Sequence, residues 1–366
     1  MTAPIVVFGA TGYTGRLAVE ALLRRGTAPV IMGRREPELA ALAQDLGGLE
    51  YRVADVTDPT SVRSAVNPGE VLLSTVGPFG RFGRIPAQVA AETGVHYVDS
   101  TGEVGFVRDI QSSLDVTART NGVTMIPAFG YDYVPGLLAG ALALAEAPDA
   151  ASMELGYFAT GSLRKGLSQG TKSSMADGIT LPNTVWRDGR LAETRAAETV
   201  RDFTVHGRKK SAFLVSGTEV LFLPEIGRSL TTVEVFNGWF PSLSRTLSMA
   251  SAVANLVSHT TVGAGIIDCV SRKVVGPSGG PDFAERARTL THVVARARDS
   301  SGRDLAEVHL EGPSIYTLTG ELLATAAEKL ASGEAQKMGV LSPLEVFGVE
   351  IIEQEAARIG LRRVSI

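Results

Sequence analysis

The sequence predicts an α/β protein: an N-terminal Rossmann-type, doubly wound parallel sheet, followed by a second α+β domain built on a mainly antiparallel sheet. Three observations support this prediction. Short apolar segments alternate with amphipathic segments as far as residue 128. A glycine-rich turn joins the first apolar segment to the first amphipathic one. Beyond residue 148 the alternation gives way to strand-like segments separated by turns.

The N-terminal segments follow one another at the spacing of βα units. Short and nearly continuous apolar strands are typical of a parallel sheet covered on both faces, and right-handed crossovers then connect the strands. The expected strands are Ile5–Phe8, Val30–Met32, Tyr51–Val56, Val71–Val76, Val95–Asp99 and Val123–Ala128. The expected helices are Arg16–Arg25, Glu36–Leu46, one opened by Asp58 and Pro59, Pro86–Thr93 and Val104–Thr120.

The second part of the chain has a different pattern, and we place the domain boundary after residue 148. Residues 1–148 are predicted to form a dinucleotide-binding domain, and residues 149–316 a second domain for the substrate. A Ser-Ser-Gly turn separates two strand-like segments that we expect to pair antiparallel. The expected elements are strands Met153–Thr160, Arg288–Arg298 and Asp304–Leu310, a loop or short helix at Gly161–Gly178, and amphipathic helices Thr317–Ala331 and Pro343–Ile359.

Composition and charge exclude several classes of protein. The 366 residues are 44% hydrophobic and 20% charged, which is ordinary for a globular chain. A net charge of −4 gives no electrostatic reason to bind nucleic acid. A lone cysteine, Cys269, excludes an intramolecular disulfide and a cysteine-based zinc site. Because the N-terminus also lacks the pattern of a targeting segment, we expect a cytoplasmic protein.

One stretch raises the question of membrane association. Thr246–Ile267 contains no Asp, Glu, Lys or Arg and is long enough to cross a bilayer. It also contains several Ser, Thr, Asn and His side chains, which are costly to place in lipid. We therefore expect a helix packed within the protein, with a membrane-associated structural protein as the competing interpretation.

The glycine-rich turn has the spacing G-x-x-G-x-x-G. Gly9 permits a tight turn, Gly12 lets a pyrophosphate approach the backbone, and Gly15 lets the helix pack close to the sheet. The free N–H groups and the dipole at the start of that helix favour phosphate. The sequence thus predicts a dinucleotide site, the alternative being a glycine turn without a ligand. The predicted cofactor contacts in the turn are Gly9, Thr11, Gly12, Tyr13, Thr14 and Gly15.

The end of the second strand indicates which dinucleotide binds. A site selecting NAD usually has Asp or Glu there to accept the ribose 2′-hydroxyl, whereas this chain has Gly33, Arg34 and Arg35. Guanidinium groups suit a 2′-phosphate dianion. We therefore predict NADP(H), with solvated surface arginines as the alternative. Glu36 is interpreted as a first-turn residue of the next helix.

The ends of the third and fourth strands supply further candidates. Asp55 can accept from the adenine amino group, or else cap a helix as Asp58 and Thr57 also can. Ligands of open α/β sheets bind at the carboxyl edge, where the fourth strand ends. Phe79 could cover a ring there. The remaining predicted cofactor contacts are Val56, Thr75, Val76, Gly77 and Pro78.

These residues, in this order, resemble the saccharopine dehydrogenase-like NADP-binding oxidoreductases, and among them the bacterial trans-acting enoyl reductase branch. The resemblance implies an NADP(H) cofactor, C-terminal helices (317–366) that pack back on the nucleotide domain, and a homodimer. The motifs that carry it are GATGYTG, GRR, ADV, STVGPF, HYVDSTGE at 96–103, PAFGYDYVP at 127–135, PSIYT at 313–317 and GVLSP at 339–343. The family usually has Gly-Phe-Asp-Ser where this chain has Gly130-Tyr131-Asp132-Tyr133. We expect this difference to change the shape of the entrance to the substrate site.

Two residues after the sixth strand are the catalytic candidates. Asp132 could act as an acid if burial raises its pKa, or it could cap the next helix. Tyr133 could donate a proton to an enolate or imine nitrogen, or it could simply line the site. Asp99 and Glu103 also face the predicted carboxyl edge, Glu103 with a first-turn position as its alternative. The five histidines show no H-E-x-x-H spacing, so a zinc hydrolase is not expected and we predict no metal site.

The predicted function is an NADPH-dependent oxidoreductase that reduces a conjugated C=C bond of an enoyl thioester or a related biosynthetic intermediate. Its substrate would be a small molecule or a carrier-bound acyl group. A C=N (imine, saccharopine-type) reductase is the nearest alternative. A non-catalytic NADP-binding sensor or scaffold is the alternative of another class. No Tyr-x-x-x-Lys pair, G-x-S-x-G elbow or P-loop is present in the sequence.

Overall fold

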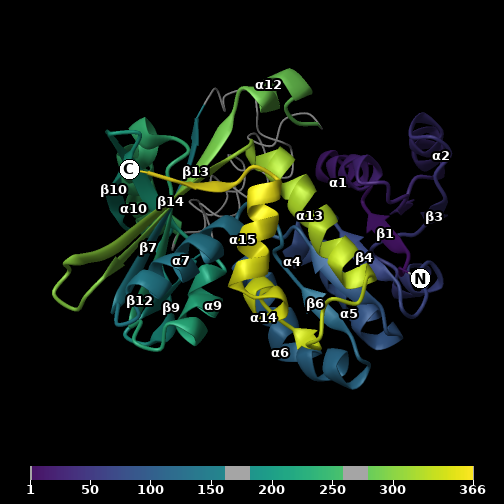
Figure 1. The fold of residues 1–366 in the computed structure, drawn as a ribbon, viewed down its shortest axis with the longest axis horizontal. Helices are drawn as coiled ribbons and strands as arrows, with labels where there is room; N and C mark the ends of the chain where they lie inside the picture. The colour runs from purple at the N-terminus through teal and green to yellow at the C-terminus, as the bar shows by residue number, and fades with distance from the viewer. Residues whose placement is uncertain (1, 161–181, 259–278, 366) are drawn as a thin grey trace. The chain divides into compact units, whose positions relative to one another are not determined.

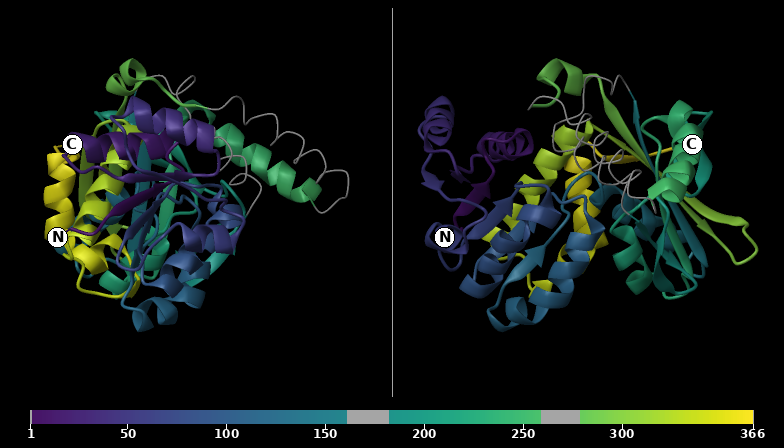
Figure 2. Two further views of the ribbon diagram at one scale, coloured as in Figure 1. Left: turned by 90° about the vertical axis from the view of Figure 1, so that its right-hand side faces the viewer. Right: turned by 180° about the vertical axis from the view of Figure 1, so that it is seen from behind.

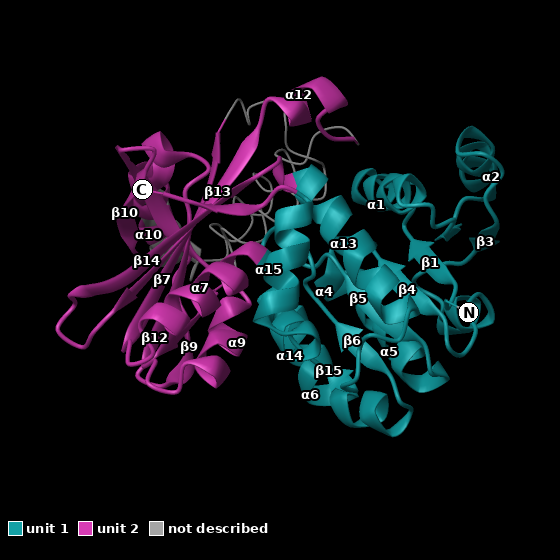
Figure 3. Ribbon diagram, viewed as in Figure 1, with its two compact units in different colours: residues 1–134, 316–359 teal, residues 135–315, 360–366 magenta. Residues whose placement is uncertain are grey.

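The computed structural model describes residues 2–160, 182–258 and 279–365, and it divides into two compact units (Figures 1 and 3). The first unit comprises residues 1–134 and 316–359, and the second comprises residues 135–315 and 360–366. The predicted loop Gly161–Gly178, Cys269 and the second half of Thr246–Ile267 lie outside the described residues.

The first unit contains a seven-stranded parallel sheet in the order β15-β6-β5-β4-β1-β2-β3, which confirms the doubly wound prediction. Its strands are β1 (Ile5–Phe8), β2 (Val30–Gly33), β3 (Tyr51–Val53), β4 (Val71–Ser74), β5 (His96–Asp99), β6 (Thr124–Ile126) and β15 (Gly339–Val340). Its helices are α1 (Tyr13–Arg24), α2 (Glu36–Asp45), α3 (Pro59–Ser64), α4 (Phe79–Phe82), α5 (Arg84–Thr93), α6 (Val104–Thr120), α13 (Ile315–Ala331), α14 (Pro343–Phe347) and α15 (Val349–Arg358).

The core of this unit is apolar because strands β1, β2 and β4 are buried at every position. One cluster joins Val6, Leu72 and Met125 of the sheet to buried side chains of α3, α5 and α6. Helix α1 packs closely against α13, where a Cβ on Gly320 would lie 3.0 Å from the Cβ of Leu17. These two helices lie side by side in both views of Figure 2. Residues 316–359 therefore complete the dinucleotide domain, whereas residues 360–366, which were expected there too, belong to the second unit.

Ion pairs also join α1 to α13. Arg25 contacts Glu321 at 2.7 Å and Glu328 at 3.1 Å, and Arg24 contacts Glu321 at 2.7 Å. The hydroxyl of Thr27 donates to Glu328 at 2.7 Å. Because Arg25, Glu321 and Glu328 are only partly exposed, their contacts fix the helix more firmly than isolated surface pairs would.

The second unit contains a nine-stranded mixed sheet with the main order β10-β11-β12-β7-β13-β14-β16, to which β8 and β9 add. Among the described strands, all pairings are antiparallel except that of β7 with β12, which agrees with the predicted mainly antiparallel sheet. Its strands are β7 (Ser152–Thr160), β8 (Asn183–Arg187), β9 (Arg190–Thr194), β10 (Val200–Val205), β11 (Arg208–Val215), β12 (Thr232–Asn237), β13 (Leu290–Arg298), β14 (Asp304–Gly312) and β16 (Arg362–Val364). Its helices include α7 (Val134–Glu146), α9 (Glu219–Ile226), α10 (Ser244–Ser258) and α12 (Phe283–Ala287).

This second sheet curls, so that strands far apart in the strand order share one core. Phe203 of β10 stacks against Phe158 of β7 at a ring-centre distance of 5.6 Å, although two strands lie between them in the sheet. Phe236 lies 5.8 Å from Phe203 on the same inner face. The edge strand β10 is thereby brought over β7 and β13.

Three details differ from the sequence prediction. Helix α7 belongs to the second unit, where Gly136 and Gly140 let it approach Tyr157 and Leu223, so the unit boundary precedes this helix instead of following it. The predicted helix Pro343–Ile359 is two helices, because Gly348 takes a φ of +80° between them. The edge strand β15 was not predicted, since it has only two residues.

Candidate functional site

The glycine turn has the geometry of a phosphate-binding loop. Gly9 has a φ of +89°, and a Cβ there would lie 2.8 Å from the hydroxyl of Thr75. A Cβ on Gly15 would lie 2.2 Å from the carbonyl oxygen of Gly9, so only glycine fits where the helix passes the turn. Helix α1 begins at Tyr13 with Gly12 as its N-cap, without a side-chain cap or a first-turn carboxylate. The positive end of the helix dipole is thus left for an anion.

The two arginines after β2 lie in different electrostatic surroundings. Arg35 is the N-cap of α2, and its guanidinium contacts the carboxylate of Glu38 at 2.6 Å in an exposed i,i+3 pair. Arg34 makes no ion pair within the described ranges, and its charge helps to lower the pKa of Asp55. Glu36 lies in the first turn of α2, as predicted. Arg34 is therefore the arginine better placed to take a 2′-phosphate.

Asp55 does not cap a helix. Its Oδ1 accepts from the backbone N–H of Thr57 at 2.9 Å and from the Thr57 hydroxyl at 2.7 Å, and these bonds lower the pKa of Asp55. Asp58 is the cap of α3, accepting from the N–H of Thr60 at 2.9 Å. Val56 is 9% exposed. Asp55 is thus held as an oriented, ionised acceptor at the end of β3.

The loop after β4 is anchored by two contacts. The hydroxyl of Thr75 donates to the carbonyl oxygen of Phe8 at 3.2 Å, which ties this loop to the end of β1. The carboxylate of Glu103 accepts from the N–H groups of Phe79 and Gly80 at 2.7 and 2.8 Å. Phe79 is buried against Phe106 and does not lie open to a ring ligand, contrary to the expectation for this residue. The ring of Phe106 in α6, 5.6 Å away between ring centres, covers the Phe79 side chain.

The loop-holding role of Glu103 was not predicted. Glu103 is the N-cap residue of α6, and its side chain reaches across to the first turn of α4. The sequence gives only a weak signal for this role of Glu103. A carboxylate lies beside the expected carboxyl edge of the sheet, and a glycine-containing loop follows the neighbouring strand. Val76, Gly77 and Pro78 lie between the two anchors.

Asp99 has a structural position at the end of β5. It is fully buried, and its Oδ1 accepts from the N–H groups of Thr101 and Ala128, both at 2.9 Å. Ala128 takes a φ of +61°, so this carboxylate supports an unusual backbone turn after β6. Burial raises the pKa of Asp99 to about 6. The residue therefore joins the ends of β5 and β6 and orients the segment that carries Asp132.

Asp132 is accessible and poorly solvated at the same time. Asp132 is exposed, and its Oδ2 atom lies close to the backbone of Gly102. No hydrogen bond to its carboxylate is found in the described part of the chain. Loss of solvation raises the pKa of its carboxyl to about 6. A carboxyl with these properties can hold and release a proton near neutral pH.

Tyr133 is held differently from its neighbour. It is 4% exposed, and its hydroxyl donates to the carbonyl oxygen of Gly102 at 2.5 Å. The backbone N–H of Tyr131 donates to the hydroxyl of Thr319 in α13 at 3.2 Å. Helix α13 thus helps to fix the segment that carries Asp132.

Comparison with known proteins defines the class of this first unit. Residues 5–126 match the family described as the saccharopine dehydrogenase NADP-binding domain. Residues 5–126 of the first unit are therefore similar to the NADP-binding domain of saccharopine dehydrogenases, and the cofactor is NADP(H). The resemblance read from the sequence motifs is confirmed.

Particular relatives sharpen this assignment. A trans-acting enoyl reductase of Mycobacterium leprae is 34% identical over 137 residues, which are 36% of this chain and 33% of that protein. The chain thus aligns with about a third of the length of that relative. A protein of Mycobacterium tuberculosis, named provisionally as a trans-acting enoyl reductase, is 25% identical over 98% of this chain and 96% of its own. A lipid droplet localized protein of Caenorhabditis elegans is 29% identical over 36% of this chain and 34% of its own.

Solved structures support the fold. Saccharopine dehydrogenase from Saccharomyces cerevisiae matches with a TM-score of 0.64 at 12% identity, covering 100% of both chains. A homospermidine synthase of Legionella pneumophila gives 0.64 at 9% identity, covering 100% of this chain and 92% of that one. Within the described residues, no helix combines the length and apolarity that a membrane crossing needs.

Proposed function

We propose that the protein is an NADPH-dependent reductase of a conjugated C=C bond, acting on an enoyl thioester or a related acyl intermediate. The NADP-binding domain and the names of the mycobacterial relatives support this proposal. The observation that carries it is Asp132, a carboxyl with a pKa of about 6 and no hydrogen-bond partner in the described chain, in the segment that follows β6. The acyl group would be a small thioester or carrier-bound, and the protein would act in the cytoplasm, with homodimer formation as a further prediction.

Reduction of an enoyl thioester needs a hydride at the β-carbon and a proton at the α-carbon. NADPH, held by the glycine turn and Arg34, would supply that hydride. Asp132 holds the proton on its carboxyl oxygen and releases it to the α-carbon of the resulting enolate. The carboxylate then takes a proton back from water. Since general acids work best with a pKa near the working pH, a value of about 6 suits this role.

The neighbouring groups are less suited to that proton transfer. Asp99 is fully buried and already accepts two backbone hydrogen bonds. The hydroxyl proton of Tyr133 is directed at the carbonyl oxygen of Gly102. We propose that Tyr133 positions the loop that presents Asp132 and that it does not itself protonate the substrate.

Cofactor contacts are proposed in the four loops that follow β1, β2, β3 and β4. The backbone from Gly9 to Gly15 would cradle the diphosphate, with Arg34 on the 2′-phosphate and Arg35 assisting. Asp55 would accept from the adenine amino group, and Thr75 would fix the loop beside the nicotinamide ribose. The residues proposed to approach the cofactor from these loops are Thr11, Gly12, Tyr13, Thr14, Gly33, Val56, Val76, Gly77 and Pro78.

A substrate panel tests the proposal. Consumption of NADPH would be followed by its absorbance with a short enoyl thioester, a cyclic imine and a saturated thioester. We expect reduction of the enoyl thioester alone, and a fall of kcat by at least about 100-fold in Asp132→Asn. Asp132→Glu should retain more activity than Asp132→Asn. Asp45→Asn, an exposed carboxylate at the end of α2, is the matched control and should leave kcat unchanged.

The alternative outcomes are distinct. Turnover with the imine and none with the enoyl thioester would replace the C=C assignment by a C=N reductase. NADPH binding without turnover of any substrate in the panel would favour a sensor or scaffold. Full activity of Asp132→Asn would remove this residue from the proton transfer.

A further inference from the structure

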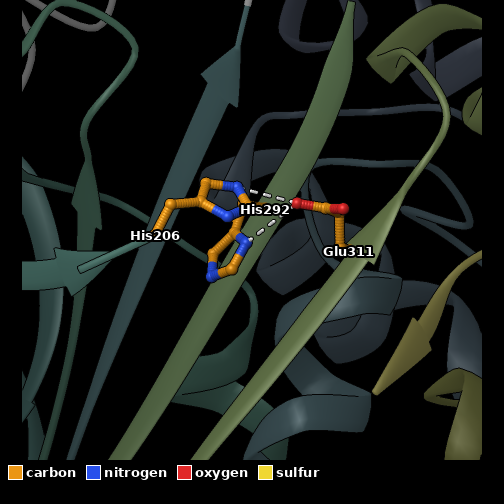
Figure 4. A group of neighbouring side chains, drawn as sticks. All are labelled: His206, His292 and Glu311. Atoms are coloured by element: carbon orange, nitrogen blue, oxygen red, sulfur yellow. Dashed lines mark hydrogen bonds and ion pairs between the residues drawn. The ribbon is translucent and has the colours of Figure 1, made fainter. Parts of the chain in front are cut away.

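The second unit contains a cluster of histidine and glutamate side chains that the proposed reduction does not use. His206 lies in the turn between β10 and β11, His292 lies on β13, and Glu311 lies on β14. One ligand atom from each of the three lies within 4.8 Å of the other two. Figure 4 shows the two imidazoles and the carboxylate pointing toward one another. We propose that His206, His292 and Glu311 form a binding site for one divalent transition-metal ion of the zinc type.

The distances fit such a site after a small adjustment. The Nε2 atom of His206 lies 2.8 Å from the Oε2 atom of Glu311, and the Nδ1 atom of His292 lies 3.5 Å from the same oxygen. Bonds of about 2.1 Å to a central ion place neighbouring ligand atoms about 3 to 3.5 Å apart. The His206 side chain is 51% exposed and is therefore free to make the adjustment, whereas the His292 side chain is 2% exposed and fixed.

Hydrogen bonds behind the cluster determine which nitrogen of His292 is available. Glu307 accepts from the Nε of Arg296 at 2.9 Å and lies 2.9 Å from the Nε2 of His309. A carboxylate that pairs with arginine is an acceptor, so the Nε2 of His309 carries the proton. In the neutral ring the Nδ1 of His309 is then an acceptor, and it lies 2.9 Å from the Nε2 of His292.

The proton position on His309 also determines which form of His292 faces Glu311. Because its Nε2 donates to His309, the neutral His292 ring presents a lone pair on Nδ1. That lone pair faces the Oε2 of Glu311, which is also an acceptor. Two electron pairs facing each other at 3.5 Å form a position that a cation stabilises. The chain from Arg296 through Glu307 and His309 also matches the outer hydrogen bonds that orient metal-binding histidines.

The position of His206 gives the site an unusual anchor. His206 and Gly207 form a two-residue turn, with φ values of +52° and +67°, between the paired residues Val205 and Arg208. Such turns favour Asn or Asp followed by Gly. Histidine in this conformation is explained if its side chain is needed over β13 and β14. A metal ion there would fasten the β10–β11 turn to strands that are not its neighbours in the sheet.

The ligand set selects among metal ions. Two imidazoles and one carboxylate favour Zn²⁺ and similar first-row ions over Mg²⁺ and Ca²⁺, which prefer oxygen ligands. Three protein ligands leave coordination positions for water or for a small anion.

The test uses the full chain without a histidine tag, freed of metal by chelation. Isothermal titration calorimetry with Zn²⁺ should give one site per chain, and Co²⁺ should give the visible absorption of a low-symmetry site. His206→Asn is the main variant, because asparagine suits this turn and should preserve the fold. We expect it to weaken Zn²⁺ binding by more than about 100-fold, and His309→Gln by about 10- to 100-fold, as for outer-sphere changes.

Two further measurements make the result decisive. Zn²⁺ should raise the Tm of the wild-type protein and not that of His206→Asn. Glu311→Gln should lose binding, whereas Glu193→Gln, an exposed glutamate on β9 of the same unit, should not. Equal Zn²⁺ affinity in wild type and His206→Asn, or no saturable binding below about 100 µM (some 5.5 kcal/mol), would overturn the proposal. NADPH binding serves as an independent check that each variant is folded.

Discussion

The two sheets of this protein differ in where they place charge. In the first unit, strands β1, β2 and β4 are buried at every position and carry no charged residue, so the polar groups gather in the loops at the carboxyl ends. In the second unit, charged side chains stand along the strands themselves. Glu154 of β7 pairs with Arg201 at 3.1 Å and Arg298 at 3.0 Å, and Arg296 pairs with Glu307 at 2.9 Å.

This difference separates two ways of building a polar site. A parallel sheet covered on both faces has no room for charge within its strands, so its ligands must approach the strand ends. A curled sheet with one partly polar face can hold charge along its strands, provided that every buried charge has a partner. Glu154 and Glu234 stand opposite each other in the β7–β12 register, and arginines compensate both. The following predictions test each half of this contrast, beginning with the largest expected effect.

Gly15→Ala should abolish the cofactor function of the first unit. The new Cβ would lie 2.2 Å from the carbonyl oxygen of Gly9, and both groups are backbone or fixed to it. We expect NADPH affinity to fall by more than about 100-fold and the free energy of unfolding to fall by about 3 kcal/mol. Calorimetry and urea unfolding measure these effects. Gly105→Ala, where a Cβ meets nothing within 4 Å, should be neutral or stabilising.

Glu154→Gln should destabilise the second unit. The Glu154 side chain is 7% exposed and pairs with three arginines. Its neutralisation would leave Arg201 without an ion pair in the described chain, and Arg296 and Arg298 with one carboxylate each. We expect a loss of about 3 kcal/mol in the free energy of unfolding, measured in urea. Glu193→Gln is the exposed control and should cost less than about 0.5 kcal/mol. Similar values for the two variants would show that the charged face is not a stabilising network.

The pH dependence of Asp132 links activity and stability. Its carboxyl has a pKa of about 6 in the folded protein and an ordinary value of 3.8. The folded protein therefore holds a proton that the unfolded chain releases between these values, so stability falls as pH rises from about 4 to 6. Asp132→Asn should raise the Tm at pH 7.5, and this advantage should disappear below pH 4.

The pH dependence of kcat should report the same ionisation of Asp132. Since the protonated carboxyl is the proposed acid, kcat should decline as pH rises through about 6, and the decline should be absent in the residual activity of Asp132→Asn. A flat profile in the wild-type enzyme would mean that another step limits turnover or that another group donates the proton.

Arg34→Ala should give the smallest of these effects. We expect the preference for NADPH over NADH to fall about 10-fold, which corresponds to loss of one charge-assisted contact to the 2′-phosphate. Arg35→Ala should change the preference less, because Arg35 already pairs with Glu38. The double variant should lose the preference entirely. Binding of both dinucleotides, measured by calorimetry, checks all three. An unchanged preference in the double variant would move the 2′-phosphate elsewhere.

Local sequence patterns predicted the parts of the fold that depend on local chemistry. The glycine turn, the first-turn position of Glu36 and the β13–β14 hairpin follow from spacing and residue type alone. The unit boundary did not, because α7 follows β6 as a crossover helix would. The approach of Gly136 to Tyr157 and of Gly140 to Leu223 shows that it packs in the second unit.

The candidate sites show the same limit. Asp132 and Tyr133 are adjacent in sequence, yet one carboxyl is left unbonded and one hydroxyl is tied to Gly102. Residue type did not distinguish them. The predicted hairpin could have indicated that His292 faces Glu311, since the two are paired across β13 and β14. No sequence pattern brings His206 to them, because that contact depends on the curl of the sheet.

The discontinuity of the first unit limits how the protein can be divided. The polypeptide leaves this unit at Val134 and returns at Tyr316. The unit therefore consists of two segments that are separated in sequence by most of the second unit. A fragment cut at residue 148 would lack the partner of α1 and would expose Arg25 and Leu17 to solvent. A soluble minimal NADP-binding protein should instead fuse residues 2–134 to residues 316–359 through a short linker, which retains α13 beside α1.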